Sequence, residues 1–355
     1  MEAVLLVGGL GTRLRPLTLR CPKPMLPVAG VPFVAHQLAL AAEAGVTRVV
    51  LATAYRPEVF ARLGDGSAWG VELVLVTEEE PLGTGGAIAN AGTRLESGAE
   101  DPVVILNGDV LSGHDLRAQL RMHRDVGADV TLHLVEVEDA RPFGSVPTDA
   151  TGRVTAFLEK SENPPTNRIN AGCYVFRRSV VAAIPSGRVV SVERETFPGL
   201  LAGGAVVQGY VETAYWLDLG TPAALVRGSC DVVRGVLHSP ARPGPAGESL
   251  VLEGARVAPG ARITGGSVVG PGAVVEGDAI VDGCVVASGA VVRSGVRACR
   301  SVVGVDAVVG ERTRLEDAVV GDGAFVGADC ELVAGARVWA DVHLPDKAVR
   351  VSSDA

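Results

Sequence analysis

The sequence predicts an α/β protein whose first part is a mostly parallel sheet with helices on both faces and whose second part is a parallel β-helix. From Met1 to about Gly235, apolar runs of strand length alternate with segments of helical length and spacing. This alternation indicates parallel strands joined by covering helices. After residue 249, aliphatic residues recur mainly six positions apart, with a small residue two positions before each. That period is typical of a parallel β-helix.

The first part divides into strands and helices in chain order. We expect strands at residues 3–7, 49–52, 71–76, 103–106 and 130–134. We expect helices at residues 33–44, 84–95 and 115–126. Ligands of such sheets bind beyond the carboxyl ends of the strands. The segments that follow the first strand and the strand at 103–106 are therefore expected to face one crevice.

The second part follows a linker rich in proline and glycine. We place the boundaries at 1–235 for the first domain, 236–249 for the linker, 250–340 for the repeats and 341–355 for a tail that includes His343. Steps of five, from Val275 to Ile280 and from Leu315 to Val320, predict register slips. The alternative is a β-sandwich, but its turn signals come about 8–12 residues apart. The repeated aliphatic residues are Val257, Ile263, Val269, Val275, Ile280, Val286, Val292, Val303, Val309, Leu315, Val320, Val326, Leu332 and Val338.

Composition and charge limit the classes of function. The chain has 355 residues, 47% of them hydrophobic, and a formal net charge of −9. This charge disfavours nucleic acid as a partner, because nucleic-acid binders present a basic face to phosphates. No stretch reaches the roughly 20 apolar residues that a membrane helix needs. The six cysteines form no Cys-x-x-Cys pair, so we expect reduced thiols, packed as small apolar side chains, in a cytoplasmic protein.

A glycine-rich segment follows the first expected strand. Gly8, Gly9 and Gly11 lie within four positions, and glycine lets the backbone turn at positive φ and bring N–H groups close to an anion. Arg13 and Lys23 add positive charge, the first as a planar fork and the second as a point charge. The segment has neither the Gly-Lys-Ser/Thr end of a Walker loop nor the spacing of a dinucleotide fingerprint. We predict a phosphate-binding loop of another kind.

The longer string carries a family resemblance. Residues 9–18 (GLGTRLRPLT), followed by Pro22-Lys23-Pro24, resemble the signature of sugar-1-phosphate nucleotidyltransferases. The resemblance implies a Rossmann-like sheet followed by a left-handed β-helix. It also implies that a sugar 1-phosphate oxygen attacks the α-phosphorus of a nucleoside triphosphate and that pyrophosphate leaves. Arg13, Lys23 and Lys160 would be the catalytic residues.

Two aspartates resemble the metal-binding motifs of that family. Asp109 ends residues 106–109 (LNGD), and Asp218 lies in residues 216–222 (WLDLGTP). Mg²⁺ prefers hard oxygen ligands and is often held by one or two carboxylates plus substrate phosphates. We therefore expect Mg²⁺ as the cofactor, bound by Asp109 and Asp218. By itself an aspartate is more often a turn former or a helix cap, and Asp218 could cap the helix that follows it.

A second set of motifs resembles the sugar-phosphate site. In residues 157–160 (FLEK), the resemblance implies that Glu159 accepts hydrogen bonds from sugar hydroxyls and that Lys160 contacts the sugar phosphate. The chain departs from the family at Ser161, where many members have proline. The sugar-phosphate-binding residues so implied are Gly144, Glu159, Asn170 and Gly172.

The nucleotide is expected to contact the glycine loop and a second loop at residues 81–87 (PLGTGGA). The second loop resembles the one that runs under the nucleotide base and opens a helix, and Thr84 could also cap that helix. A guanine contact needs a carboxylate or carbonyl acceptor, and Glu78, Glu79 and Glu80 all remain candidates. The nucleotide-binding residues so implied are Leu6, Gly8, Gly9, Gly11, Thr12, Gly83, Thr84, Asn107 and Gly108.

The motifs together look most like mannose-1-phosphate guanylyltransferases. This resemblance includes residues 191–198 (SVERETFP), the hexapeptide repeats and the endings 344–346 (LPD) and 352–354 (SSD). The expected reaction joins GTP and mannose 1-phosphate into GDP-mannose and pyrophosphate. The alternatives are another sugar or cyclitol 1-phosphate (glucose, heptose or valienol-like), another nucleoside triphosphate, a non-catalytic regulatory subunit, and a purely structural β-helix.

The repeats are expected to support a homo-oligomer, because the flat faces and open ends of a β-helix need covering. They contain no histidine between Leu250 and Ala340. This argues against a second activity as a coenzyme A acyltransferase, which usually needs a histidine base. The expected partners are therefore small-molecule substrates and further copies of the chain, with no nucleic acid and no membrane.

Overall fold

The computed structural model describes residues 1–242 and 244–349. The chain folds into two compact units. The first comprises Met1–Gly9 and Val34–Trp216, and the second comprises Leu10–Phe33 and Leu217–Ala355. The part of the expected phosphate-binding loop that follows Gly9 thus belongs to the same unit as the repeats. The motif at 352–354 lies outside the described residues, together with the rest of 350–355.

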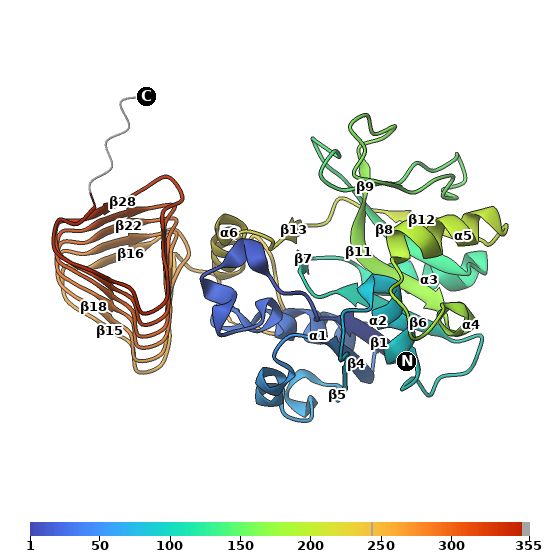
Figure 1. Ribbon diagram of the computed structural model, residues 1–355, viewed down its shortest axis with the longest axis horizontal. Coiled ribbons are helices and arrows are strands. Elements are labelled where there is room, and N and C mark those ends of the chain that lie inside the picture. The colour runs from blue at the N-terminus through green and yellow to red at the C-terminus, as the bar shows by residue number, and fades with distance from the viewer. Residues whose placement is uncertain (243, 350–355) are drawn as a thin grey trace. The chain divides into compact units, whose positions relative to one another are not determined.

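A nine-stranded mixed sheet forms the centre of the first unit (Figure 1). Its strands are β1 (Glu2–Leu6), β4 (Arg48–Thr53), β5 (Glu72–Thr77), β6 (Pro102–Asn107), β8 (Val130–Glu136), β9 (Gly144–Ser145), β10 (Leu158–Glu159), β11 (Arg168–Arg177) and β12 (Val207–Val211). β5, β4, β1 and β6 are parallel, β11 is antiparallel to β6 and β8, and β12 is parallel to β8. All five expected strands are confirmed, and β11 is a central antiparallel strand that the sequence analysis did not predict.

Helices and short elements complete the layout. The helices are α1 (Phe33–Glu43), α2 (Gly83–Gly92), α3 (Leu116–Val126), α4 (Arg178–Ala183), α5 (Phe197–Ala202) and α6 (Pro222–Val233). The short helical turns are η1 (Thr12–Leu14), η2 (Leu17–Leu19), η3 (Lys23–Met25), η4 (Pro57–Leu63), η5 (Ser67–Trp69) and η6 (Val192–Thr196), and the short strands are β2 (Pro27–Val28), β3 (Val31–Pro32), β7 (Val110–Ser112) and β13 (Trp216–Asp218). The three expected helices are confirmed as α1, α2 and α3. None of the helices in the described part of the chain is long and apolar enough to cross a membrane.

Caps define where two of the helices begin. The Asp115 carboxylate accepts a hydrogen bond from the Ala118 amide at 2.9 Å at the start of α3. The Thr221 hydroxyl accepts one from the Ala224 amide at 3.2 Å at the start of α6, where Pro222 occupies the first helical position. Both arrangements satisfy amide groups that have no partner within the helix. Thr221, rather than Asp218, therefore caps α6.

Aromatic side chains fix the strands that carry the sugar-phosphate motifs. Tyr174 and Phe176 of β11 and Phe197 of α5 are fully buried. The rings of Tyr174 and Phe197 meet edge to face at 5.2 Å, and Phe157, next to β10, lies 5.1 Å from Phe197. Burial of one such side chain contributes roughly 1.5–3 kcal/mol. This packing holds β10 and β11 to the core.

The β-helix of the second unit consists of three sheets of stacked parallel strands (Figure 1). The first sheet contains β14 (Ser249–Val251), β17 (Ser267–Val269), β20 (Val285–Val286), β23 (Val302–Val303), β26 (Val319–Val320) and β29 (Arg337–Val338). The second contains β15 (Arg256–Val257), β18 (Val274–Val275), β21 (Val291–Val292), β24 (Val308–Val309), β27 (Phe325–Val326) and β30 (His343–Leu344). The third contains β16 (Arg262–Thr264), β19 (Ile280–Asp282), β22 (Arg297–Cys299), β25 (Arg314–Glu316) and β28 (Glu331–Leu332). This confirms the predicted fold class and is consistent with the left-handed type.

Two details of the repeat differ from the expectation. His343 lies in β30, where its ring stacks on that of Phe325 at 4.4 Å, instead of on a tail. Val281, not Ile280, fills the core of its coil, since Val281 is fully buried and Ile280 is only partly buried. The first register slip therefore falls between Val281 and Val286, whereas the slip between Leu315 and Val320 lies where it was expected.

The slips occur at corners that turn through a single left-handed residue. Gly283, Arg300 and Asp317 have φ values of 58°, 46° and 51° at three successive coils. The corner of the preceding coil has two such residues, Gly265 and Gly266. One fewer left-handed residue shortens the corner, which explains the step of five. The Arg300 guanidinium also bonds the Asp317 carboxylate of the next coil at 2.8 Å.

Small residues at the corners bind successive coils together. The Ser267 hydroxyl accepts a hydrogen bond from the Cys284 amide at 2.9 Å, and the Ser301 hydroxyl accepts one from the Ala318 amide at 3.0 Å. Such bonds satisfy buried backbone groups that the short strands leave unpaired. All six cysteines are free thiols, and four of them are buried, in agreement with their expected role as small packed side chains.

Candidate active site

The carboxyl ends of β1 and β6 bring together the first group of nucleotide-binding candidates. Leu6 pairs with Asn107 across the two strands. The Gly108 amide donates to the Leu6 carbonyl at 2.9 Å. A Cβ at Gly108 would lie 2.3 Å from that same oxygen, so only glycine allows this approach. Asp109 follows in the turn before β7 and is partly exposed.

Gly172 connects this group to the sugar-phosphate candidates. It has a φ of 77°, and a Cβ there would lie 3.0 Å from the side-chain nitrogen (Nδ2) of Asn107. The Gly172 amide donates to the Asn170 side chain at 3.0 Å. Asn170, Gly172 and Asn107 are therefore immediate neighbours in the first unit.

The remaining sugar-phosphate candidates lie on β9 and β10. Glu159 pairs with Gly144, and a Cβ at Gly144 would come within 2.9 Å of both the Glu159 carboxylate and the Phe157 ring. Burial and the nearby Glu193 carboxylate raise the pKa of Glu159 above its usual value. A carboxyl with a raised pKa in a partly buried position suits hydrogen bonding to sugar hydroxyls.

Lys160 follows with a strained backbone. Its φ is 51°, an unusual value for a residue with a side chain. Its amide donates to the Phe143 carbonyl at 3.1 Å. The ammonium group lies 4.0 Å from the Glu159 carboxylate, and the side chain is 64% exposed. The strained turn thus directs the lysine into solvent, where a phosphate can reach it, and such strain is often found at functional sites.

The loop at residues 81–87 is held by two other segments. Thr84 lies inside α2 instead of capping it, because the helix begins at Gly83. Its hydroxyl donates to the Glu193 carboxylate at 2.7 Å and accepts from the Val192 amide at 2.9 Å. The Gly85 amide donates to the Val190 carbonyl at 2.8 Å. The loop and residues 191–198 therefore form a single structure, and Glu193 is a residue that the sequence analysis did not assign.

Glu78 differs from its two neighbours. It is buried, and its carboxylate accepts a hydrogen bond from the Leu82 amide at 3.0 Å. Burial raises the pKa of Glu78 above its usual value. Glu79 and Glu80 are exposed. Glu78 thus shapes the loop, whereas the other two carboxylates face solvent.

The second unit contains the rest of the segment that is expected to bind phosphate. Gly11 has a φ of 59°, and a Cβ there would lie 3.0 Å from the Thr18 methyl and 3.2 Å from Lys23. The Thr18 hydroxyl donates to the Gly11 carbonyl at 2.8 Å. Thr12 begins η1 and is exposed, as is Gly9 in the first unit. Gly11 is therefore the point where the loop folds back on itself, which only glycine allows without strain.

Asp218 lies between the two cations of this loop. Its carboxylate is 3.6 Å from the Lys23 ammonium and 3.8 Å from the Arg13 guanidinium. The side chain of Lys23 is 10% exposed, that of Asp218 is 27% exposed and that of Arg13 is 67% exposed. The pair with Lys23 is shielded from solvent, whereas the pair with Arg13 is weakened by it.

Gly220 makes room for the Arg13 guanidinium. A Cβ at Gly220 would lie 2.5 Å from an Arg13 nitrogen and 3.0 Å from the Asp218 carboxylate. The φ of Gly220 is not in the left-handed region, so its importance is steric rather than conformational. The sequence analysis quoted this glycine only as part of a motif.

Comparison with known proteins identifies the family. The sequence model of the nucleotidyl transferase family matches residues 2–235, and that of the GMPPB C-terminal domain matches residues 246–354. The chain belongs to the nucleotidyl transferase family. It is therefore a nucleotidyltransferase, and enzymes of this family generally use a divalent metal.

Individual relatives agree with this family. A mannose-1-phosphate guanylyltransferase of Mycobacterium tuberculosis is 56% identical over 100% of this chain and 98% of its own length. Mannose-1-phosphate guanylyltransferase 1 of Arabidopsis thaliana is 38% identical over 64% of this chain and 63% of its own. The crystal structure of HddC from Yersinia pseudotuberculosis complexed with GMP-PN has a TM-score of 0.55 and 28% identity, over 64% of this chain and 97% of that chain.

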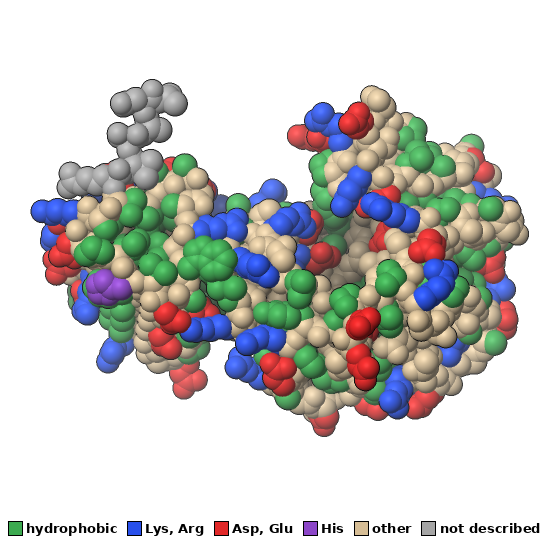
Figure 2. Space-filling view, viewed as in Figure 1, with side chains coloured by type: hydrophobic (Ala, Val, Ile, Leu, Met, Phe, Trp, Pro, Cys, Tyr) green, Lys and Arg blue, Asp and Glu red, His purple; other side chains and the backbone are tan. Residues whose placement is uncertain are grey.

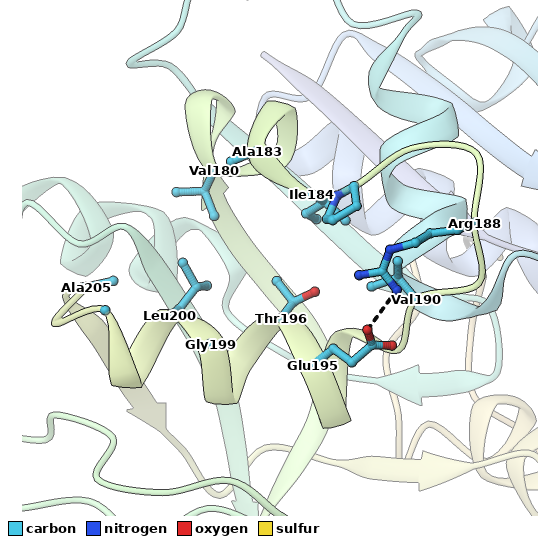
Figure 3. A pocket seen from close by; sticks show the side chains of 12 residues that line it. Val180, Ala183, Ile184, Arg188, Val190, Glu195, Thr196, Gly199, Leu200 and Ala205 are labelled. Atoms are coloured by element: carbon cyan, nitrogen blue, oxygen red, sulfur yellow. Dashed lines mark hydrogen bonds and ion pairs between the residues drawn. The ribbon is translucent and has the colours of Figure 1, made fainter.

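A separate pocket of about 360 Å³ lies among α4, η6 and α5 of the nucleotidyltransferase (Figure 3). Its lining is mostly apolar, and Arg188 pairs with Glu195 at 3.0 Å beside it. Val190, whose carbonyl holds the Gly85 amide, is part of the lining. The pocket thus borders the loop at residues 81–87, but none of the site residues expected from the sequence line it.

A buried cluster of two histidines and a glutamate lies elsewhere in the first unit. His114 donates to the Glu212 carboxylate, and its other ring nitrogen lies 2.7 Å from the side-chain oxygen of Gln119. The Gln119 side-chain nitrogen donates to the Thr131 carbonyl at 3.0 Å. This bond fixes the orientation of the Gln119 amide, so the atom that faces His114 is its oxygen. Both ring nitrogens of His114 therefore face acceptors, which requires a protonated imidazolium. The cluster thus contains a buried imidazolium–carboxylate pair.

The second histidine makes a metal ion unsuitable here. The His133 ring stacks on that of His114 at 3.8 Å with an interplanar angle of 16°. A metal ion bound by both rings would have to lie near both ring planes, and two nearly parallel planes do not meet close to the rings.

The two histidines have opposite shifts in pKa. Burial would lower the pKa of His114, but Cys173 and Glu212 outweigh it and raise that pKa to about 10. Burial lowers the pKa of His133 to about 4.

Replacement of Gly220 by alanine should reduce catalysis without reducing stability. The added methyl group displaces the Arg13 guanidinium. If that guanidinium contacts phosphate as the sequence predicts, its complete loss would cost on the order of 100-fold in kcat. We expect Gly220→Ala to lower kcat by at least about tenfold, a part of that full effect. Steady-state kinetics and thermal unfolding measure the two effects. Gly199→Ala is the control, because nothing lies within 4 Å of its added Cβ; equal kinetics for both variants would contradict the steric role.

Replacement of Glu212 by glutamine should destabilise the fold. It leaves the His114 imidazolium buried without its counter-ion, which costs roughly 3–5 kcal/mol. The pKa of His114 rises from 6.5 to about 10 on folding, so the contribution of the pair is complete below pH 6.5 and is lost as the pH rises toward 10. Urea unfolding at several pH values should therefore show a difference between variant and wild type that shrinks in alkali.

The control for this prediction is Glu136→Gln, which removes a largely exposed partner of Arg168. We expect this control to cost less than about 1 kcal/mol. A Glu212→Gln variant as stable as the control would show that His114 is not charged in the folded protein.

Proposed function

We propose that this nucleotidyltransferase transfers the guanylyl group of GTP to mannose 1-phosphate. A phosphate oxygen of mannose 1-phosphate forms a bond to the α-phosphorus of GTP, and the bond from that phosphorus to the β-phosphate oxygen breaks. The products are GDP-mannose and pyrophosphate. The observation that carries this proposal is the 56% identity, over the full chain, with a relative named mannose-1-phosphate guanylyltransferase.

The proposed roles follow from charge and position. Arg13 and Lys23 would neutralise the triphosphate and the leaving pyrophosphate, since nucleotidyl transfer depends mainly on positioning and charge stabilisation. The backbone near Gly8, Gly11 and Gly108 would approach the phosphates, and the loop near Gly83 would lie against the base. Glu159 would accept hydrogen bonds from sugar hydroxyls, and the exposed ammonium of Lys160 would bind the sugar phosphate.

We propose Mg²⁺ as the divalent metal, with Asp109 and Asp218 as its protein ligands. Both side chains are partly exposed carboxylates, which fits an ion that keeps several waters and binds substrate phosphates. When bound, the ion would neutralise phosphate charge. Asp218 would be the counter-ion of Lys23 and Arg13 when nucleotide is absent, and the triphosphate would take over that role.

The same transfer chemistry also accommodates other substrates. The chemistry described above does not depend on the sugar, so glucose, a heptose or a cyclitol could replace mannose, and another base could replace guanine. The exposed carboxylates of Glu79 and Glu80 favour guanine, because its N1 and N2 groups are donors. A regulatory subunit without activity would not need the shielded Lys23–Asp218 pair beside Arg13.

The exposed surface of the β-helix and the free thiols bear on oligomeric state and location. Large apolar side chains are exposed on the β-helix at Val251, Val305, Trp339 and Val342, and hydrophobic side chains gather on the visible face of this part (Figure 2). Such surface favours self-association. Six free thiols favour a reducing cytoplasm.

A matrix of substrates tests the reaction. Purified protein with Mg²⁺ should release pyrophosphate fastest with GTP and mannose 1-phosphate, among five nucleoside triphosphates and a set of sugar and cyclitol 1-phosphates. We expect kcat/KM for this pair to exceed that for other pairs by at least about tenfold, the effect of one well-placed polar contact. A faster rate with another pair would reassign the substrate, and binding without turnover across the matrix would favour the regulatory subunit.

A further inference from the structure

We propose that Arg337, in the first sheet of the β-helix, is a positioning residue for the nucleotide-binding loop. One guanidinium nitrogen of Arg337 donates to the carbonyl of Arg13 at 2.8 Å and to the carbonyl of Arg15 at 2.7 Å. The two acceptors flank Leu14, the last residue of η1. The partners are 324 and 322 positions apart in the chain and belong to the same compact unit.

These hydrogen bonds meet a requirement of the loop. A short helical turn leaves its last carbonyls without partners inside the turn, and a basic side chain at that end both bonds the carbonyls and favours the local dipole. In η1, the Leu14 and Arg15 amides bond back to Gly11 and Thr12. The carbonyls of Arg13 and Arg15 instead accept hydrogen bonds from the Arg337 guanidinium.

The contact fixes the backbone from which the Arg13 side chain extends. Leu14 is fully buried, so the turn is held on one side by packing and on the other by Arg337. Between these supports the Arg13 guanidinium reaches to 3.8 Å from Asp218 and fills the space left by Gly220. Loss of Arg337 would leave the guanidinium chemically intact but less well placed.

A second contact supports the same arrangement. Arg20, which follows η2, forms an ion pair with Asp341 in the turn before β30. The side chains of Arg20 and Asp341 are 52% and 61% exposed, so solvent weakens this ion pair. Residues 10–33 also contact the rest of the second unit, for example through the hydrogen bond from the Ala29 amide to the Ser229 hydroxyl at 2.9 Å. The last coils of the β-helix thus hold the loop through its backbone.

The role of Arg337 rests on the proposed role of Arg13 in triphosphate binding. It predicts a selective effect on the nucleotide. We expect Arg337→Ala to weaken GTP binding and to raise the KM for GTP by about tenfold, as commonly follows loss of hydrogen bonds to a charged group. The KM for mannose 1-phosphate should change less than about twofold, and Arg337→Lys should recover part of the loss because it retains a charged donor.

The experiment compares Arg337→Ala, Arg337→Lys, Asp341→Ala and the control Arg314→Ala in the full-length protein. Arg314 is also a β-helix arginine, and its guanidinium pairs with Glu316 of its own strand at 2.6 Å. Calorimetric titration with GTP and Mg²⁺, without sugar phosphate, gives the affinity, and thermal unfolding reports on the fold. Asp341→Ala should weaken GTP binding in the same direction by a smaller factor.

Three outcomes would overturn the proposal. These are unchanged GTP affinity in Arg337→Ala, an equal loss in Arg314→Ala, or a rise in both KM values by the same factor together with a large fall in unfolding temperature. The titration does not require turnover. A wild-type protein that binds GTP but releases no pyrophosphate would contradict the proposed function while leaving the role of Arg337 testable.

Discussion

The ion pairs of Asp218 with Lys23 and Arg13 are the interaction on which the predicted phosphate-binding loop depends. The loop brings two cations together, and the Lys23 side chain is almost fully buried. A buried ammonium is costly unless a negative charge lies close to it. Asp218 supplies that charge from the end of β13, beside Gly220, which keeps the space open for the Arg13 guanidinium. Under the function proposed above, the triphosphate would replace Asp218 as the counter-ion of these two cations.

The fold supports this arrangement through residues that are far apart in the chain. Residues 10–33 follow the first strand of the sheet, yet they form a compact unit with residues 217–355. Within that unit Arg337 bonds the carbonyls on both sides of Leu14, and Thr221 caps the helix that follows Asp218. The last coils of the β-helix thus contact the loop that carries Arg13.

The sequence predicted the parts of this protein that depend on local pattern. Alternating apolar runs located five strands and three helices, and the six-residue period identified the β-helix. Residue types and family resemblance brought out Gly11, Arg13, Lys23 and Asp218, which the structure brings together in one unit. The roles of the expected site residues, in both units, stay predictions.

The sequence could not predict contacts that depend on distant pairing. The bond from Thr84 to Glu193 and those from Arg337 to the loop join residues 109 and more than 300 positions apart. Neither period nor motif encodes such pairings. Ile280 and Val281 are adjacent and both aliphatic, so the repeat pattern does not distinguish them. Only the geometry of the corner decides that the Val281 side chain faces the core. The antiparallel direction of β11 likewise depends on the connections around it.

The exchange of anions at Asp218 is tested most directly by calorimetric titration of GTP into wild type and Asp218→Asn, with Mg²⁺ and with a chelator. If Asp218 competes with the triphosphate for Lys23 and Arg13, the variant should bind GTP more tightly than wild type when no metal is present. If Asp218 also binds the metal, the variant should bind more weakly than wild type when Mg²⁺ is present. Weaker binding of equal size in both conditions would contradict this account.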